Sequence, residues 1–181
     1  MSRNFASTKP SGPASLRPNL RAFSTEAGKM NLSKKMGIDN IPHLIKDKRV
    51  LMRVDFNVPM KDGQVSDPKR IVATLPSINY LLENNAKSLV LMSHMGRPQG
   101  EKNEKFSLKP LVPVIEDLLK KKVIWVPDCV GTDTAKIVAG AKNGEIVLLE
   151  NLRYYKAEEG KGVVNGEKVK ASKEEIAAFR K

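Results

Sequence analysis

The chain has 181 residues, of which 40% are hydrophobic and 29% charged, as in an ordinary soluble globular domain. It contains no run of about 18 apolar residues that would predict a membrane span. Its single cysteine, Cys129, excludes an internal disulfide and is expected to be a small buried thiol, and no residues have the spacing of a zinc site. The net charge of +12 attracts anions of any kind, but an aromatic content of 5% without a stacking platform argues against nucleic acid.

The first 30 residues differ in composition from the rest. They are rich in Arg and Ser and contain one acid, Glu26, which is typical of an organelle transit peptide. The run Arg21-Ala22-Phe23-Ser24 resembles a mitochondrial processing site and predicts cleavage after Phe23. We therefore expect a mitochondrial protein. The alternatives are a plastid location, a disordered basic tail, or an internal start at Met30 that gives a cytoplasmic form.

Strand and helix patterns alternate from residue 49 onward. The sequence predicts strands over residues 50–54, 88–92, 123–126 and 146–149. It predicts helices over 67–84, 108–120 and 133–142, the first capped by Asp67 and the last closed by Gly144. Pro113 makes the first turn of the second helix irregular or delays its start. A turn at 165–166 and a helix capped by Ser172 and Glu175 follow.

This alternation predicts an α/β fold, a three-layer parallel sheet with helices on both faces, Rossmann-like. Ligands of such sheets bind at the carboxyl ends of the strands, and polar clusters follow three of the predicted strands. The first cluster holds Asp55 and Asn57, the second holds His94 and Arg97, and the third holds Asn151 and Arg153.

Each cluster has a structural interpretation as well as a functional one. Asp55 and Asn57 can hold a turn or point at a hydroxyl or an arginine. His94 and Arg97 can donate to a phosphate, and Arg153 can bind an anion or pair with Glu158 or Glu150. Arg70, near the start of a helix, opposes the helix dipole, which hints at a function.

The clusters together are more specific than any one of them. The order VDFNVP, Arg70, SHMGRP, DCVG, LLENLR and AEEGKG resembles phosphoglycerate kinase from about residue 34 to 181. The resemblance implies the N-terminal domain of a two-domain fold, truncated, without the C-terminal domain that binds Mg-ADP or Mg-ATP.

The family's reaction is reversible phosphoryl transfer between 1,3-bisphosphoglycerate and ADP, giving 3-phosphoglycerate and ATP in glycolysis. The resemblance implies that Asp55 and Asn57 engage the glycerate hydroxyl, and that Arg70 acts catalytically on the acyl phosphate. It implies that His94, Arg97 and Arg153 hold the other phosphate, and that the protein is monomeric.

The chain alone is expected to be inactive and to bind no cofactor or metal. Gly160-Lys161-Gly162 is too short to be a nucleotide phosphate loop. An unpaired sheet edge is expected to make the fold poorly stable. The alternative to an enzyme is a non-catalytic 3-phosphoglycerate-binding module derived from that family.

Overall fold

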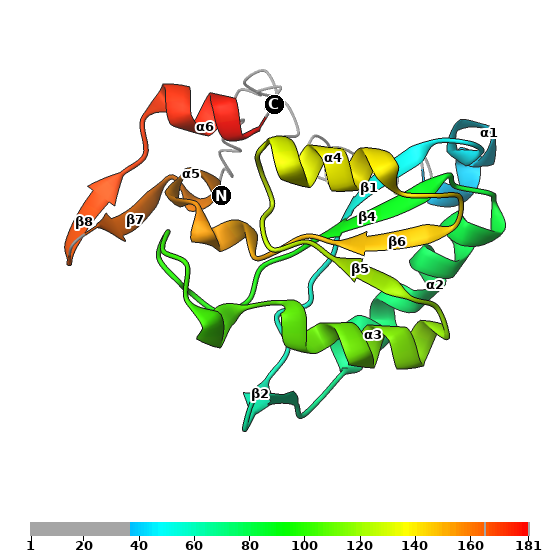
Figure 1. Cartoon of the computed structure of the whole chain (residues 1–181), viewed down its shortest axis with the longest axis horizontal. Coiled ribbons are helices and arrows are strands. Elements are labelled where there is room, and N and C mark those ends of the chain that lie inside the picture. Colours follow the sequence, from blue (N-terminus) through cyan, green and yellow to red (C-terminus); the bar gives the residue numbers. More distant parts are fainter. Residues whose placement is uncertain (1–36, 165, 181) are drawn as a thin grey trace, which may run out of the picture. The chain divides into compact units, whose positions relative to one another are not determined.

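A parallel sheet of four strands organises the computed structural model, which describes residues 37–164 and 166–180. The strands are β1 (Arg49–Arg53), β4 (Ser88–Met92), β6 (Glu145–Leu148) and β5 (Val123–Trp125), in the spatial order β1-β4-β6-β5 (Figure 1). The central strands β4 and β6 are almost continuously apolar, as strands buried on both faces must be. The parallel register aligns the carboxyl ends of β1, β4 and β6. Arg53 of β1 lies beside Met92 of β4, and Leu91 of β4 lies beside Leu148 of β6.

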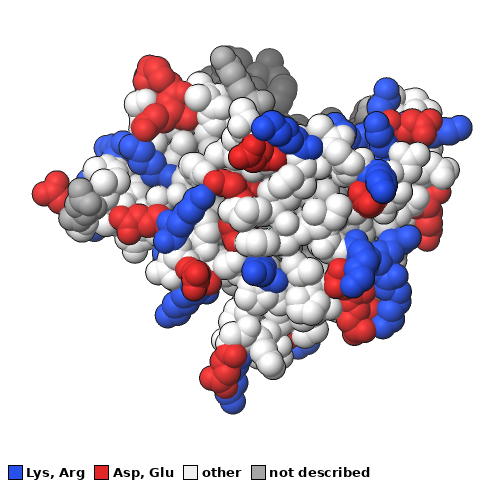
Figure 2. Space-filling model, in the orientation of Figure 1, with Lys and Arg blue, Asp and Glu red and all other residues white. Residues whose placement is uncertain are grey.

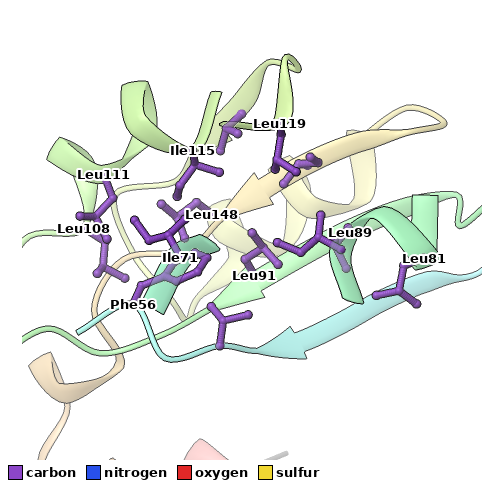
Figure 3. Packing of buried hydrophobic residues seen from close by; sticks show 14 of the residues in the cluster. Phe56, Ile71, Leu81, Leu89, Leu91, Leu108, Leu111, Ile115, Leu119 and Leu148 are labelled. Carbon is purple, nitrogen blue, oxygen red and sulfur yellow. The ribbon is translucent and has the colours of Figure 1, made fainter. Parts of the chain in front are cut away.

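Helices cover both faces of this sheet. Helices α2 (Lys69–Glu83) and α3 (Val112–Leu119) pack on one face, and α4 (Thr132–Gly140) packs on the other. The larger apolar cluster lies beneath α2 and α3 and brings together Phe56, Ile71, Leu91, Ile115 and Leu148 (Figure 3). The predicted three-layer α/β fold is therefore confirmed.

The predicted helix starts are mostly confirmed, with small shifts. Helix α2 begins at Lys69. The backbone N–H of Lys69 donates to Asp67 Oδ1 at 3.0 Å, so Asp67 bonds to the first turn of the helix. A 3₁₀ turn (η4, Lys109–Leu111) precedes α3, which confirms the irregular start predicted from Pro113. The predicted end of α4 was wrong: the helix stops at Gly140, and Gly144 lies in the following turn with φ +78°.

The carboxyl-terminal part forms a hairpin and a short helix. Strands β7 (Lys161–Val164) and β8 (Glu167–Lys170) pair antiparallel, and α6 (Lys173–Phe179) follows. The predicted capping box is confirmed, since Ser172 Oγ accepts from the Glu175 N–H at 3.0 Å and Glu175 Oε2 accepts from the Ser172 N–H at 2.8 Å. Asn165 of the predicted turn lies outside the described residues, as does the predicted transit peptide.

Smaller elements were not predicted. A two-residue hairpin of β2 (Met60–Lys61) and β3 (Gln64–Val65) turns at Asp62-Gly63, and α1 (Pro42–Ile45) and α5 (Lys156–Glu159) are single turns. Three further 3₁₀ turns are η2 (Ile38–Asn40), η3 (Glu104–Phe106) and η5 (Leu152–Tyr154). Among the described residues, no helix is both long and apolar enough to cross a membrane.

Cys129 is partly buried rather than fully buried, at the border of the apolar cluster under α4. Burial, reinforced by the negative charge of Asp128, raises the pKa of its thiol to about 12. The thiol therefore stays protonated at neutral pH, and Cys129 packs as a small apolar side chain.

Candidate functional site

The carboxyl ends of β1, β4 and β6 place the predicted site residues at one edge of the sheet. Asp55 and Asn57 follow β1, His94 and Arg97 follow β4, and Arg153 follows β6 in η5. Arg70 joins them from the first turn of α2. Hydrogen bonds of Asn57 and Arg153 to Gly96 link all three strand ends.

Asp55 and Arg70 form an ion pair. The Arg70 Nη1 donates to Asp55 Oδ2 at 2.7 Å, and the two side chains are 53% and 58% exposed. Asp55 Oδ1 also accepts from the Asn57 backbone N–H at 3.3 Å, so this carboxylate holds its own turn as well. An exposed pair of this kind contributes at most ~1 kcal/mol, so a stronger anion can compete for the guanidinium.

Asn57 and Arg153 meet on the two sides of Gly96. The Gly96 N–H donates to Asn57 Oδ1 at 2.9 Å, and the Gly96 carbonyl accepts from Arg153 Nη1 at 3.0 Å. Gly96 has φ +58°, and an added Cβ would overlap the Phe106 ring. These bonds fix the loop that carries His94 and Arg97 between the ends of β1 and β6.

His94 is half-buried among charged groups. Partial burial is the main cause that lowers the pKa of its imidazole, and the positive charge of Arg153 adds to it. Asp55 and Glu158 oppose this shift without reversing it. The imidazole is therefore mainly neutral at pH 7, and the negative charge of a bound phosphate would raise its pKa.

Arg97 is exposed and lines an open cavity of about 740 Å³ together with Arg153. Among the described residues, the Arg97 side chain is in no ion pair. A cation that lacks an internal partner and faces a cavity is available to an anionic ligand.

Arg153 also has acidic neighbours. Its Nε lies 3.2 Å from Glu159 Oε1 and 3.7 Å from Glu158 Oε2, while Arg53 Nη2 pairs with Glu158 at 2.6 Å. The contact with Glu159 is an ion pair without a hydrogen bond, since the buried Arg153 Nε has no hydrogen-bond partner among the described residues. The structural pairing with Glu158 is thus present, but it leaves Arg153 incompletely satisfied.

Three buried polar residues hold the site together: Ser93, Asn151 and Glu150. The sequence pattern places Asn151 in a polar cluster but predicts a structural role for none of the three. Ser93 Oγ donates to the Val54 carbonyl at 2.9 Å and accepts from the Phe56 N–H at 3.0 Å. Asn151 Nδ2 donates to the carbonyls of Met95 and Phe106, both at 2.8 Å.

Glu150 is the third of these residues. It accepts hydrogen bonds from Ser107 Oγ at 2.6 Å, the Leu108 N–H at 2.8 Å and the Asn151 N–H at 2.7 Å. Glu150 and Asn151 stand inside the LLENLR motif, where a polar pair directly after a buried strand is the signal that could have identified them.

A second network anchors the segment that follows β5. Asp128 accepts from Lys102 Nζ, from the Tyr155 hydroxyl and from the Cys129 N–H at 2.6, 2.6 and 2.7 Å. Burial would raise the pKa of Asp128, but these hydrogen bonds together lower it. The carboxylate is therefore charged and structural, which explains the DCVG motif without a catalytic role.

Charges of both signs are mixed on the face of the molecule that Figure 2 shows. Figure 2 shows Lys and Arg side chains among Asp and Glu side chains rather than one continuous basic patch. This face lacks the basic stripe that a nucleic-acid footprint requires. The described residues also contain no group of three or more His, Cys, Asp or Glu side chains that could hold a metal ion.

Comparison with known proteins identifies the family of this chain. The family model for phosphoglycerate kinase matches residues 38–179. Phosphoglycerate kinases from Sterkiella nova and Euplotes crassus are 66% and 61% identical over 150 and 149 residues, which cover 83% and 82% of this chain. The chain spans only 36% of the length of each of these relatives.

Solved structures give the same result. The crystal structure of phosphoglycerate kinase from Pyrococcus horikoshii superposes with a TM-score of 0.62 and 32% identity, over 71% of this chain and 31% of that one. The enzyme from Coxiella burnetii gives a TM-score of 0.55 at 32% identity, over 66% of this chain and 28% of that one. The parallel fold, the motifs at its strand ends and these matches together place the chain in the phosphoglycerate kinase family.

Proposed function

We propose that this chain supplies the phosphoglycerate-binding part of a phosphoglycerate kinase. That enzyme transfers a phosphoryl group reversibly between 1,3-bisphosphoglycerate and ADP, giving 3-phosphoglycerate and ATP. The observation that supports the proposal is that the bonds of Asn57 and Arg153 to Gly96 link three strand ends, and the Asp55–Arg70 pair joins the first turn of α2 to the end of β1. Such an edge suits a small phosphorylated acid, because it presents cations beside hydrogen-bonding amide and carboxylate groups.

In this proposal each side chain takes a role that its surroundings permit. Asp55 and Asn57 orient the glycerate hydroxyl, and Arg70 stabilises charge on the transferring phosphoryl group. His94, Arg97 and Arg153 hold the second phosphate, which would displace the imperfect contact between Arg153 and Glu159. Phosphoryl transfer needs mainly positioning and charge neutralisation, which this set of groups can provide.

Substitution of Arg153 tests the proposal. Arg153→Ala should weaken 3-phosphoglycerate binding by at least about tenfold, because a charge-assisted contact to phosphate contributes about 1.5–3 kcal/mol. Isothermal titration calorimetry on the 181-residue chain measures this loss. Arg49→Ala, at the amino end of β1, is the charge-matched control and should bind like the unmodified chain. Equal affinity of the Arg153 and Arg49 variants would contradict the assignment.

The 181 residues alone are proposed to bind without turnover. Holding both reactants together accounts for ~7–11 kcal/mol of a barrier, and the sequence contains no phosphate loop for Mg-ATP or Mg-ADP. A coupled assay with 3-phosphoglycerate and Mg-ATP should therefore show no activity above background. Turnover at the roughly 1–100 s⁻¹ of ordinary kinases would refute this part of the proposal.

We also propose that residues 1–23 direct the protein to mitochondria. Their Arg- and Ser-rich composition supports this, as does the start of the family match at residue 38, beyond the segment. Sequencing the amino terminus of the protein isolated from its source should find Ser24 first. A mature chain that begins at Met1 or Ser2 would contradict cleavage.

A further inference from the structure

The cavity that contains Arg97 and Arg153 extends well past these two residues. Its other walls come from the Gln99 loop and from hairpin β7–β8, which Figure 1 shows beyond the carboxyl end of β6. The lining includes five cationic residues and one acid, namely Arg97, Arg153, Lys161, Lys168, Lys170 and Glu159. A volume of about 740 Å³ falls in the range of pockets that hold ligands of drug size, so a three-carbon acid fills only part of it.

The hairpin is held firmly against the loop that carries Arg97. The Val163 N–H donates to the Gln99 carbonyl at 2.7 Å. At Gly162 an added Cβ would lie 2.5 Å from the Gln99 oxygen and 2.9 Å from Lys156 Cβ. Because only glycine permits this approach, the lysine-bearing hairpin is fixed as a wall of the cavity.

The three lysines of the hairpin are arranged at a cost to its stability. Lys161 and Lys170 are direct cross-strand partners, and Lys168 lies on the same face as Lys170, two residues away. Like charges directly opposite each other destabilise a two-stranded ladder. Among the described residues, none of these three ammonium groups is in an ion pair. These lysines repel one another and are not neutralised by acidic side chains. Such a cluster is expected where a bound anion neutralises the charge.

We propose that this groove binds a small polyanion that carries several phosphate groups. One phosphate lies on Arg97 and Arg153, and the others lie along Lys161, Lys168 and Lys170. Because the two arginines are shared with the proposed phosphoglycerate site, the polyanion and phosphoglycerate exclude each other. The competition with phosphoglycerate rests on the proposed function. The binding of the polyanion does not, because it is argued from the lysines of the hairpin.

Binding of inorganic tripolyphosphate to the full 181-residue chain tests the proposal. The variant with Lys161→Gln, Lys168→Gln and Lys170→Gln should bind tripolyphosphate about tenfold or more weakly, with a smaller dependence on salt. The matched control carries Lys48→Gln, Lys87→Gln and Lys121→Gln. These three exposed residues precede β1, β4 and β5 at the opposite end of the sheet, and the control should bind like the unmodified chain.

Competition separates this inference from the proposed function. Tripolyphosphate should displace 3-phosphoglycerate from the unmodified chain, and the hairpin variant should keep its 3-phosphoglycerate affinity within about twofold. If 3-phosphoglycerate does not bind at all, the proposed function fails, and the tripolyphosphate comparison still decides the polyanion site.

Three results would overturn the inference. The first is an equal loss of tripolyphosphate affinity in the hairpin and control variants, which would indicate only a general effect of net charge. The second is an unchanged affinity in the hairpin variant. The third is tighter binding of a short single-stranded oligonucleotide through the same three lysines, which would assign them to nucleic acid instead.

Discussion

Individual charged residues of the site are held by weak internal partners. Arg70 pairs with Asp55 while both side chains remain more than half exposed, and Arg153 contacts Glu159 without a hydrogen bond at Nε. Such contacts orient a guanidinium without neutralising it fully, because exposed pairs are screened by water. Orientation combined with residual charge is what an anion site requires of its arginines.

His94 provides a prediction about pH. Burial and Arg153 lower its pKa in the folded chain below the ordinary 6.5, so the unfolded chain binds its proton more readily. His94 therefore contributes stability that is present above about pH 6.5 and is lost as the pH falls toward the folded pKa. A phosphate beside the imidazole raises this pKa, so 3-phosphoglycerate should bind more tightly as the pH falls through this window.

NMR titration of the imidazole resonances measures both effects. The chain has two histidines, so His43→Gln leaves His94 as the single imidazole signal. The midpoint should lie below 6.5 in the free chain and move upward with 3-phosphoglycerate. A free-chain midpoint above 6.5, or a midpoint that the ligand leaves unchanged, would contradict the environment described here.

At the scale of elements, the site depends on the loop between β4 and η3. Asn57 and Arg153 bond to Gly96 from opposite sides, and Asn151 bonds to the carbonyls of Met95 and Phe106. The loop is thus a shared connection between the ends of β1 and β6 rather than a free surface segment. Its position is set by backbone contacts that need a glycine at residue 96.

Gly96→Ala should lower the free energy of unfolding by more than the cost of placing an alanine at a positive φ. An alanine there costs about 1–2 kcal/mol for its positive φ and about 1–3 kcal/mol more for overlap with Phe106. Gly144→Ala is the matched control, because Gly144 has φ +78° and nothing lies within 4 Å of an added Cβ. Urea denaturation measures both variants, and equal destabilisation would show that the Phe106 contact is unimportant.

At the scale of the whole molecule, the two sides of the sheet are unequally covered. The apolar cluster under α2 and α3 is extensive, whereas the cluster under α4 is small. The edge strand β1 is poorly covered on one face. On that face Leu51 is 60% exposed, and Arg49 and Arg53 lie on either side of it. The Arg49 side chain joins this face of β1 to helix α4, since its Nη2 donates to the Ala139 carbonyl near the end of α4 at 3.1 Å.

Leu51→Lys should reduce association of the chain. The β1 edge has no further strand beside it among the described residues, and an exposed apolar residue on such an edge promotes pairing between chains. Analytical ultracentrifugation over a range of concentrations should show self-association of the unmodified chain and less of it in the variant. A soluble monomer that melts cooperatively and independently of concentration would contradict both this prediction and the expected low stability.

The sequence alone determined the order and type of the main elements, because apolar periodicity and proline positions act locally. Strands near 50–54, 88–92 and 146–149 and the cap at Ser172 needed no tertiary information. Asp55, Asn57, His94 and Arg153 were predicted as site residues because polar side chains directly follow buried strands, and the structure places them at one edge of the sheet. The two-residue hairpin at Asp62-Gly63 was missed because runs this short carry no periodicity.

Only the tertiary structure decided how these residues meet. The sequence did not show which partners Ser93, Glu150 and Asn151 bind, because each bonds to a segment that is 39 to 56 residues away along the chain. The cavity shared by Arg97 and the hairpin lysines likewise depends on the docking of Gly162 against Gln99, 63 residues earlier. Local patterns specify elements, but hydrogen bonds and charges act across space, so the site is fixed by packing that no single segment encodes.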